Sequence, residues 1–120
     1  TQETACRAMS NLTRTIEGNQ TRAGTAGAVE AVAAAMRAHA GDACVQENAC
    51  GALSYLTRFN EGNQTRAGTA GAVEAVAAAM RAHAGDACVQ ENACRAMSNL
   101  TRNNKGNRAR AGNAGAVEAV

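Results

Sequence analysis

The stretch that decides the fold runs from Glu17 to Cys50 and reads EGNQTRAGTAGAVEAVAAAMRAHAGDACVQENAC. It returns letter for letter from Glu61 to Cys94, at an offset of 44 residues. The same offset pairs the tetrapeptide at 71–74 with that at 115–118, both of which read GAVE. Self-similarity at a fixed period of this length is typical of repeat architectures, in which each unit packs against its neighbours.

The period divides the chain into four parts. Residues 1–16 correspond to the third helix of a partial repeat, residues 17–60 and 61–104 to two full repeats, and residues 105–120 to the start of a further repeat. No linker interrupts this pattern. We therefore predict that residues 1–120 form a single repeat array.

Within each unit, the clearest helical pattern covers Ala28–His39. Val29, Val32 and Met36 recur there at i, i+3 and i+7, which places them on one apolar stripe of a helix. Gly41 follows and is a favourable residue at which to end this helix.

Two further helices are expected in the unit. Asp42 can cap the next helix through its carboxylate, and that helix runs through Arg58. A short segment at 63–70 follows and is ended by Gly71, although Gly68 inside it disfavours a helix. The predicted buried face of the helix after Asp42 consists of Val45, Ala49, Ala52, Leu53 and Leu56.

A short, a medium and a long helix in each unit predict an all-α fold. Tetratricopeptide and ankyrin units are about ten residues shorter than this period. HEAT units, with two helices each, share the period and are the alternative. The sequence resembles the armadillo family. AGAVEAVAAAM is similar to the second helix of that family's repeat, and VQENACGALSYLT and QETACRAMSNLT are similar to the third helix. The resemblance covers essentially the whole chain.

This resemblance implies a right-handed α-solenoid of about three tandem repeats. The third helices of such a solenoid line a concave groove that binds partners as extended segments. The family often places an Asn near the end of the third helix, where this chain has Asn11, Tyr55 and Asn99. A Trp often stands one turn earlier, but Arg7 and Arg95 occupy that position here, which counts against recognition of a basic nuclear-localisation peptide.

Each third helix presents side chains at i, i+4 and i+8, which share one helical face. Arginines in the groove favour carboxylates or phosphates on the partner. Gly51 next to Tyr55 leaves a gap that an apolar or aromatic side chain can fill. The predicted groove residues are Arg7, Asn11, Glu47, Tyr55, Glu91, Arg95 and Asn99.

These residues also have plain structural interpretations. Glu and Arg four residues apart commonly form solvated helix pairs, and this applies to Arg7 and Arg95. The cations at Arg58 and Arg102 near helix C-termini complement the helix dipole. Phe59, in the least repetitive stretch, is expected to seal a loop.

The charge balance and hydropathy exclude some classes of partner. Twelve Lys and Arg side chains stand against ten Asp and Glu, a formal charge of +2. This balance is too even to favour nucleic acid. No apolar run approaches the ~20 residues of a membrane span. We therefore expect neither a nucleic-acid nor a membrane partner.

No catalytic or metal-binding constellation stands out. His39 and His83 each precede a cysteine by five residues, which is half a zinc site at most, and a capping position near a helix end explains them better. The AGTAGA stretches lack the lysine of phosphate-binding loops. No Ser, His and acidic trio exceeds what the repeat explains. We predict no enzyme activity, no cofactor and no metal.

The five cysteines occupy two recurrent helical positions. One position holds Cys6, Cys50 and Cys94, and the other holds Cys44 and Cys88. In an alanine-rich helix a thiol usually behaves as a small buried hydrophobe. Unpaired thiols favour a reducing compartment, so we predict an intracellular protein, cytoplasmic or nuclear.

The pattern leaves three functional hypotheses. The first is a scaffold that binds a protein or peptide, acidic or with an aromatic anchor, in the groove. The second is a self-associating structural repeat, because the array starts at a third helix and stops within a second, so that uncapped ends are expected to dock head-to-tail. The third is a consensus-designed repeat scaffold with no native ligand.

Overall fold

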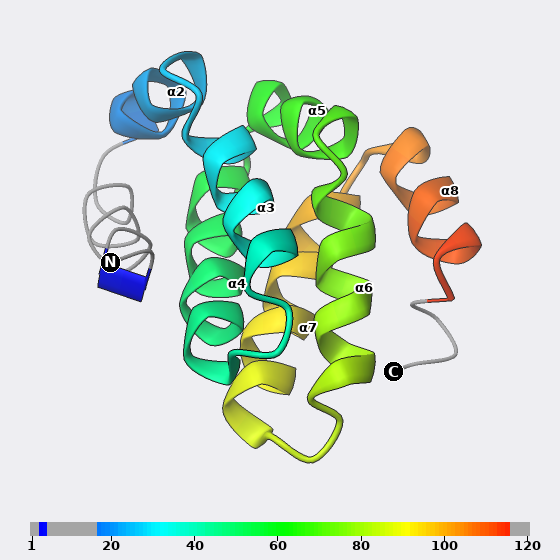
Figure 1. Cartoon of the computed structure of the whole chain (residues 1–120). Coiled ribbons are helices and arrows are strands. Elements are labelled where there is room, and N and C mark those ends of the chain that lie inside the picture. The colour runs from blue at the N-terminus through cyan, green and yellow to red at the C-terminus, as the bar shows by residue number, and fades with distance from the viewer. Residues whose placement is uncertain (1–2, 5–16, 116–120) are drawn as a thin grey trace.

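The computed structural model describes residues 3–4 and 17–115 (Figure 1), and this part of the chain is helical without strands. The all-α prediction is thereby confirmed. No helix in the described residues is long and apolar enough to cross a membrane. The helices are α2 (Glu17–Thr25), α3 (Ala28–Ala38), α4 (Ala43–Thr57), α5 (Glu61–Thr69), α6 (Ala72–Ala82), α7 (Ala87–Thr101) and α8 (Lys105–Asn113).

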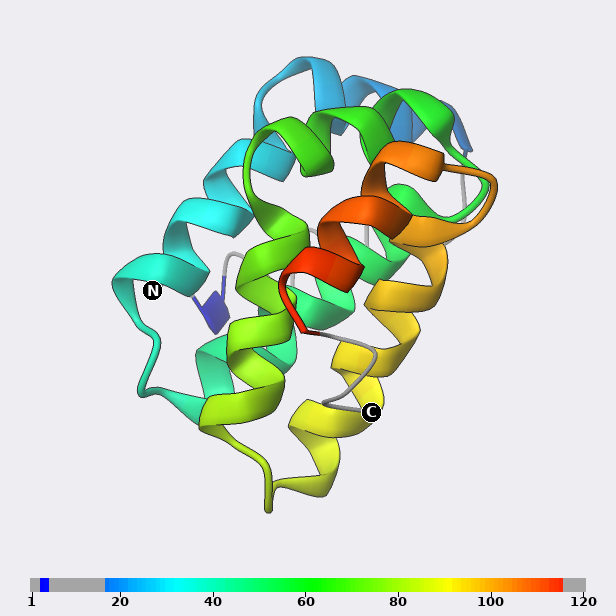
Figure 2. The same ribbon diagram turned by 90° about the vertical axis from the view of Figure 1, so that its right-hand side faces the viewer.

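The two full units have the same order of helices, namely short, medium and long. We call α2–α4 the first unit and α5–α7 the second, and α8 is the short helix of the next. Equivalent helices pack against one another, α4 on α7, α3 on α6 and α2 on α5. In Figures 1 and 2 the short helices α2, α5 and α8 follow one another along one edge of the molecule.

Helix ends lie close to the predicted ones. Asp42 caps α4, as expected, because its carboxylate accepts hydrogen bonds from the backbone N–H groups of Cys44 and Val45, at 3.0 and 3.2 Å. The short helix α5 begins two residues earlier than predicted. The side chain of Asn60 accepts the N–H of Asn63 at 3.0 Å and so caps α5, which places Gly62 inside its first turn.

The predicted apolar faces are confirmed. Val29, Val32 and Met36 of α3 are buried, and so are all five predicted residues of α4. Gly27 and Gly71 have φ values of +90° and +82°, a left-handed conformation that lets the chain turn sharply from the short helix into the medium one. The core is therefore a continuous seam of Ala, Val, Leu and Met side chains shared between units.

Buried asparagines join one unit to the next. Nδ2 of Asn63 donates to the backbone oxygens of Gln20 in α2 and Leu56 in α4, both at 2.8 Å. Asn107 repeats this contact one unit later, at 2.9 Å from the backbone oxygens of both Gln64 and Leu100. Each asparagine satisfies a carbonyl near the C-terminus of a long helix, which has no partner within its own helix.

Glycines in the short helices make room for these asparagines. A Cβ atom at Gly24 would lie 1.8 Å from Oδ1 of Asn63, and one at Gly68 would lie 2.1 Å from Oδ1 of Asn107. This close approach explains why glycine, a poor helix former, stands in the last turn of α2 and of α5.

Buried glutamines bind the last turn of the long helices. Nε2 of Gln20 donates to the backbone oxygens of Tyr55 and Arg58. Nε2 of Gln64 donates to the backbone oxygens of Thr57 at 3.2 Å and Asn99 at 3.0 Å. Polar side chains of the short helices therefore cap the long helices, and those of α5 and α8 do so across the boundary between units.

The cysteine prediction is mostly wrong. Cys50 is fully buried, but Cys44, Cys88 and Cys94 are exposed. Cys44 and Cys88 lie in the first turn of their helices, ahead of the residues that face the core. Cys94 is equivalent to Cys50 in sequence, but its side of α7 has no further long helix on it among the described residues.

Candidate binding groove

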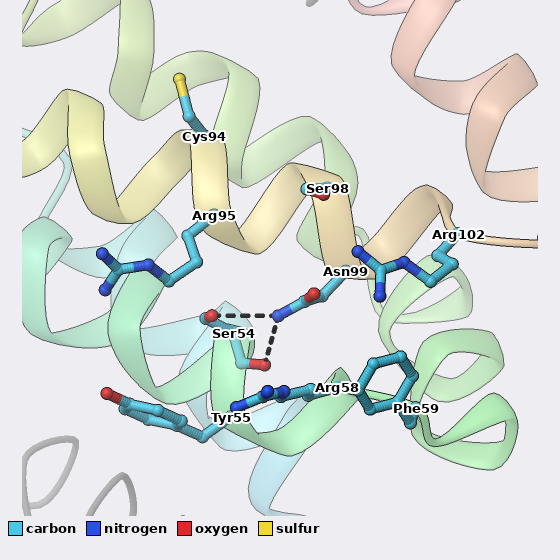
Figure 3. Close-up of a pocket in the computed structure, with 9 residues that line it drawn as sticks. All are labelled: Ser54, Tyr55, Arg58, Phe59, Cys94, Arg95, Ser98, Asn99 and Arg102. Atoms are coloured by element: carbon cyan, nitrogen blue, oxygen red, sulfur yellow. Dashed lines mark hydrogen bonds between the residues drawn. The ribbon is translucent and has the colours of Figure 1, made fainter.

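A groove of about 570 Å³ lies between the C-terminal halves of α4 and α7 and the turn after α4. Figure 3 shows its side chains. The residues that line it are Ser54, Tyr55, Arg58, Phe59, Cys94, Arg95, Ser98, Asn99 and Arg102.

Three of the predicted groove residues meet here, namely Tyr55, Arg95 and Asn99. Glu47 is half-buried on α4 and Glu91 is exposed on α7, and neither lines the groove. The other two predictions, Arg7 and Asn11, lie outside the described residues.

Asn99 forms part of the floor of the groove. It is 8 % exposed, and its Nδ2 donates to the backbone oxygen of Ser54 at 2.8 Å and to Oγ of Ser54 at 3.1 Å. The dashed lines in Figure 3 mark these two bonds. The amide hydrogens of Asn99 are thus used to join α7 to α4.

Arg95 forms an ion pair with Glu91, one turn earlier on α7. Its Nη2 lies 2.9 Å from Oε1 of Glu91, and the two side chains are 50 % and 68 % exposed. This is the ordinary i, i+4 helix pair that the sequence also allowed. An exposed pair of this kind is worth only about 0.3–0.5 kcal/mol, so a stronger anion can displace it.

Two further arginines flank Phe59 at the other end of the groove. The guanidinium carbon of Arg58 lies 5.5 Å from the centroid of the Phe59 ring, and that of Arg102 lies 5.0 Å from it. Figure 3 shows all three side chains close together. Phe59 is 64 % exposed, so it does not seal the loop as expected.

Phe59 occupies a strained turn. The backbone N–H of Asn60 donates to the carbonyl oxygen of Thr57 at 3.3 Å, Arg58 has φ −64° and ψ 115°, and Phe59 has φ +52°. These values are those of a type II turn, which favours Gly or Asn at its third position. The equivalent turn one unit later has Asn103 there, with φ +53°.

The groove coincides with the variable part of the repeat. Residues 17–50 and 61–94 are identical, whereas 51–60 and 95–104 are not. Eight of the nine lining residues come from these two variable stretches, and only Cys94 comes from the identical part. Arg58, Phe59 and Arg102 were not among the predicted site residues. Variation within an otherwise exact repeat could have marked Phe59, which stands where the next unit has Asn103, but Arg58 and Arg102 are the same residue at equivalent positions and carry no such signal.

Within residues 3–4 and 17–115, no group of three or more His, Cys, Asp or Glu side chains could hold a metal ion. The groove itself combines two aromatic rings and three guanidinium groups around a hydrogen-bonded floor. In comparisons with known proteins, no family model, no curated protein and no solved structure matches the chain.

Proposed function

We propose that the chain is an armadillo-type array, a right-handed α-solenoid, whose groove binds an extended segment of a partner protein. The observation that carries this proposal is the groove between α4 and α7, where Tyr55, Phe59 and Arg95 gather. Under the armadillo resemblance, α4 and α7 are the third helices, which are expected to line the binding groove.

The composition of the groove supports this function. Tyr and Arg are enriched among the residues that dominate binding energy at protein interfaces, because they combine apolar area with hydrogen-bond donors. Tyr55 and Phe59 supply that apolar area on one wall, and Arg95 supplies donors on the other. The floor is rigid because the Asn99 side chain is bonded to Ser54.

A screen of a display library of short random peptides against the whole chain tests the proposal. Selected peptides should lose about tenfold or more in affinity on Tyr55→Ala or Arg95→Glu, a loss of at least ~1.4 kcal/mol. Lys105→Glu is the matched control for Arg95→Glu. It makes the same change in charge outside the groove, and it restores the residue found at Glu17 and Glu61.

Helical circular dichroism should be unchanged in all three variants. The proposal fails if no peptide is selected, or if the selected peptides bind the Tyr55 and Arg95 variants as tightly as the original chain.

A second candidate function is head-to-tail self-association. Gly24 and Gly68 each receive an asparagine of the following unit, but no described atom lies within 4 Å of a Cβ built at the equivalent Gly112. A second copy of the chain could place its own asparagine there. Light scattering should then show a mass that rises with concentration, and a constant monomer mass would exclude this candidate.

An intracellular setting, cytoplasmic or nuclear, belongs to the proposal. The exposed cysteines Cys88 and Cys94 are thiols without a disulfide. Such thiols persist in a reducing compartment.

A further inference from the structure

We infer that the turn end of the groove, where Arg58 and Arg102 flank Phe59, is a subsite for a phosphoryl group on the bound segment. This inference rests on the proposed function and gives the partner its chemistry: a peptide segment that carries a phosphorylated side chain. The two arginines of this subsite, Arg58 and Arg102, occupy equivalent positions of two successive units.

The two arginines bring positive charge together without a carboxylate to offset it. Both guanidinium carbons lie within 5.5 Å of the same ring centroid. Within the described residues, neither Arg58 nor Arg102 has an acidic partner, since the ion pair of the groove is that of Arg95 with Glu91. Two guanidinium groups beside the same ring raise the positive potential there, which attracts an anion.

Phe59 presents these arginines in a form suited to oxyanions. A guanidinium that contacts an aromatic ring through its face keeps its N–H donors at its edge. Those donors remain available for the paired bonds that arginine makes to phosphate oxygens. A phosphoryl group carries close to two negative charges and three acceptor oxygens, so it can engage two guanidinium groups at once, whereas a carboxylate has one charge and two oxygens.

The other end of the groove is a poorer site for the anion. There the charge of Arg95 is offset by Glu91 at 2.9 Å. The groove therefore has a charged end at Phe59 and a nearly neutral end at Arg95. This difference fixes where the phosphoryl group of a bound segment lies.

The position of Phe59 supports the same assignment. Its φ of +52° disfavours a bulky side chain, and Asn103 fills the matching position of the next turn. An aromatic ring in this conformation is therefore unfavourable for the turn itself. Its contact with both arginines gives it a role in binding.

Three pools of degenerate synthetic peptides test the subsite, with the central residue fixed as phosphoserine, glutamate or serine. Binding to the whole chain is followed by fluorescence anisotropy. We expect the phosphoserine pool to bind about tenfold more tightly than the serine pool, with the glutamate pool in between. The Arg58→Gln/Arg102→Gln variant should bind all three pools as weakly as the original chain binds the serine pool.

Two controls separate the subsite from general charge and from the groove. The double variant Lys105→Gln/Arg108→Gln loses the same charge on α8 and should keep the phosphoserine preference. Inorganic phosphate should compete with the phosphoserine pool and not with the serine pool.

The outcomes distinguish the two proposals. If all pools bind equally, and binding depends on Tyr55, the groove function stands and the phosphoryl subsite is wrong. The subsite is also wrong if the Arg58/Arg102 variant keeps the phosphoserine preference. If no pool binds, both proposals are wrong.

Discussion

The missing Cβ atoms of the glycines in the short helices let neighbouring units approach each other closely. Gly68 is buried against Asn107, whereas the space around Gly112 is open. These two glycines occupy the same position of successive repeats, and a neighbouring asparagine is present only at Gly68. They form a matched pair for measuring the role of that space.

We predict opposite effects of alanine at these two positions. Gly68→Ala should destabilise the chain by about 2 kcal/mol, because the added methyl group overlaps Oδ1 of Asn107 and displaces its bonds. Gly112→Ala should be neutral or stabilise by about 0.5–1 kcal/mol, the difference in helix propensity. Urea unfolding followed by circular dichroism measures both. Equal effects at the two sites would contradict the packing role of Gly68.

Phe59 is a second residue at which the local conformation opposes the side chain. Phe59→Asn should change the stability of the chain by no more than about 0.5 kcal/mol. Relief of the left-handed conformation, part of a cost of about 1–2 kcal/mol, is offset by the loss of two exposed arginine contacts of about 0.5 kcal/mol each. The same variant should weaken peptide binding in the groove.

The reciprocal change at the next turn is the control. Asn103→Phe should destabilise by about 1 kcal/mol, because φ there is +53°. Thermal unfolding and peptide anisotropy measure the stability and binding of both variants. A destabilised Phe59→Asn variant would show that the ring is needed for the turn itself.

At this scale the sequence predicted only part of the site. The armadillo resemblance assigned Tyr55 and Arg95 to groove positions of the third helices, and both line the groove between α4 and α7. Phe59 was missed as a site residue because its exposure depends on a turn geometry that periodicity does not specify. For Arg95 the sequence allowed either a groove contact or an ion pair with Glu91, because spacing along the helix does not determine which rotamer the side chain adopts.

Among the helices, the short ones depend most on contacts outside themselves. Isolated helices of this length are marginal in water, so the stability of α2, α5 and α8 comes from packing and from amide bonds to neighbouring helices. Asn63 carries two of these bonds, and Arg66 donates to its Oδ1 at 3.1 Å.

Removal of one such asparagine should therefore be costly. We predict that Asn63→Ala destabilises by about 2–3 kcal/mol, because it leaves the buried carbonyls of Gln20 and Leu56 without this donor. Asn92→Ala on α7 is the matched control. Its amide bonds only to the carbonyl of Cys88 one turn earlier, so its loss should change stability by less than about 0.5 kcal/mol. Urea denaturation measures both, and similar losses would refute the capping role.

Helix positions were well predicted because each apolar stripe repeats at helical spacing. The Val29, Val32 and Met36 stripe places α3 within one residue of its observed end. The short helices were harder, because their buried positions are polar. A helix was expected at 63–70, but the burial of Asn63 and Gln64 was not, because amide side chains are buried only where carbonyl groups of neighbouring helices accept their hydrogen bonds.

For the whole molecule, we expect the equivalent contacts between units to make stability nearly additive. In stacked repeats each unit contacts only its neighbours, so each added unit contributes one further interface. The asparagine and glycine contact appears twice in the described residues, between Gly24 and Asn63 and between Gly68 and Asn107.

Lengthening the chain by one more 44-residue repeat should therefore change the response at Gly112. In the lengthened chain Gly112→Ala should destabilise by about 2 kcal/mol, because the asparagine of the added unit needs the same space. In the original chain it should not. Urea denaturation of the four proteins forms a double-mutant cycle. If Gly112→Ala has the same effect on the free energy of unfolding with and without the added repeat, the added unit packs in another way.

The contact between glycine and asparagine also has a direction along the chain of repeats. The earlier unit supplies the open space at its glycine, and the later unit supplies the asparagine that fills it. Neither surface is complementary to a copy of itself. A single interface built from these two surfaces therefore has no two-fold axis through it, and every such interface along a chain of copies has the same direction.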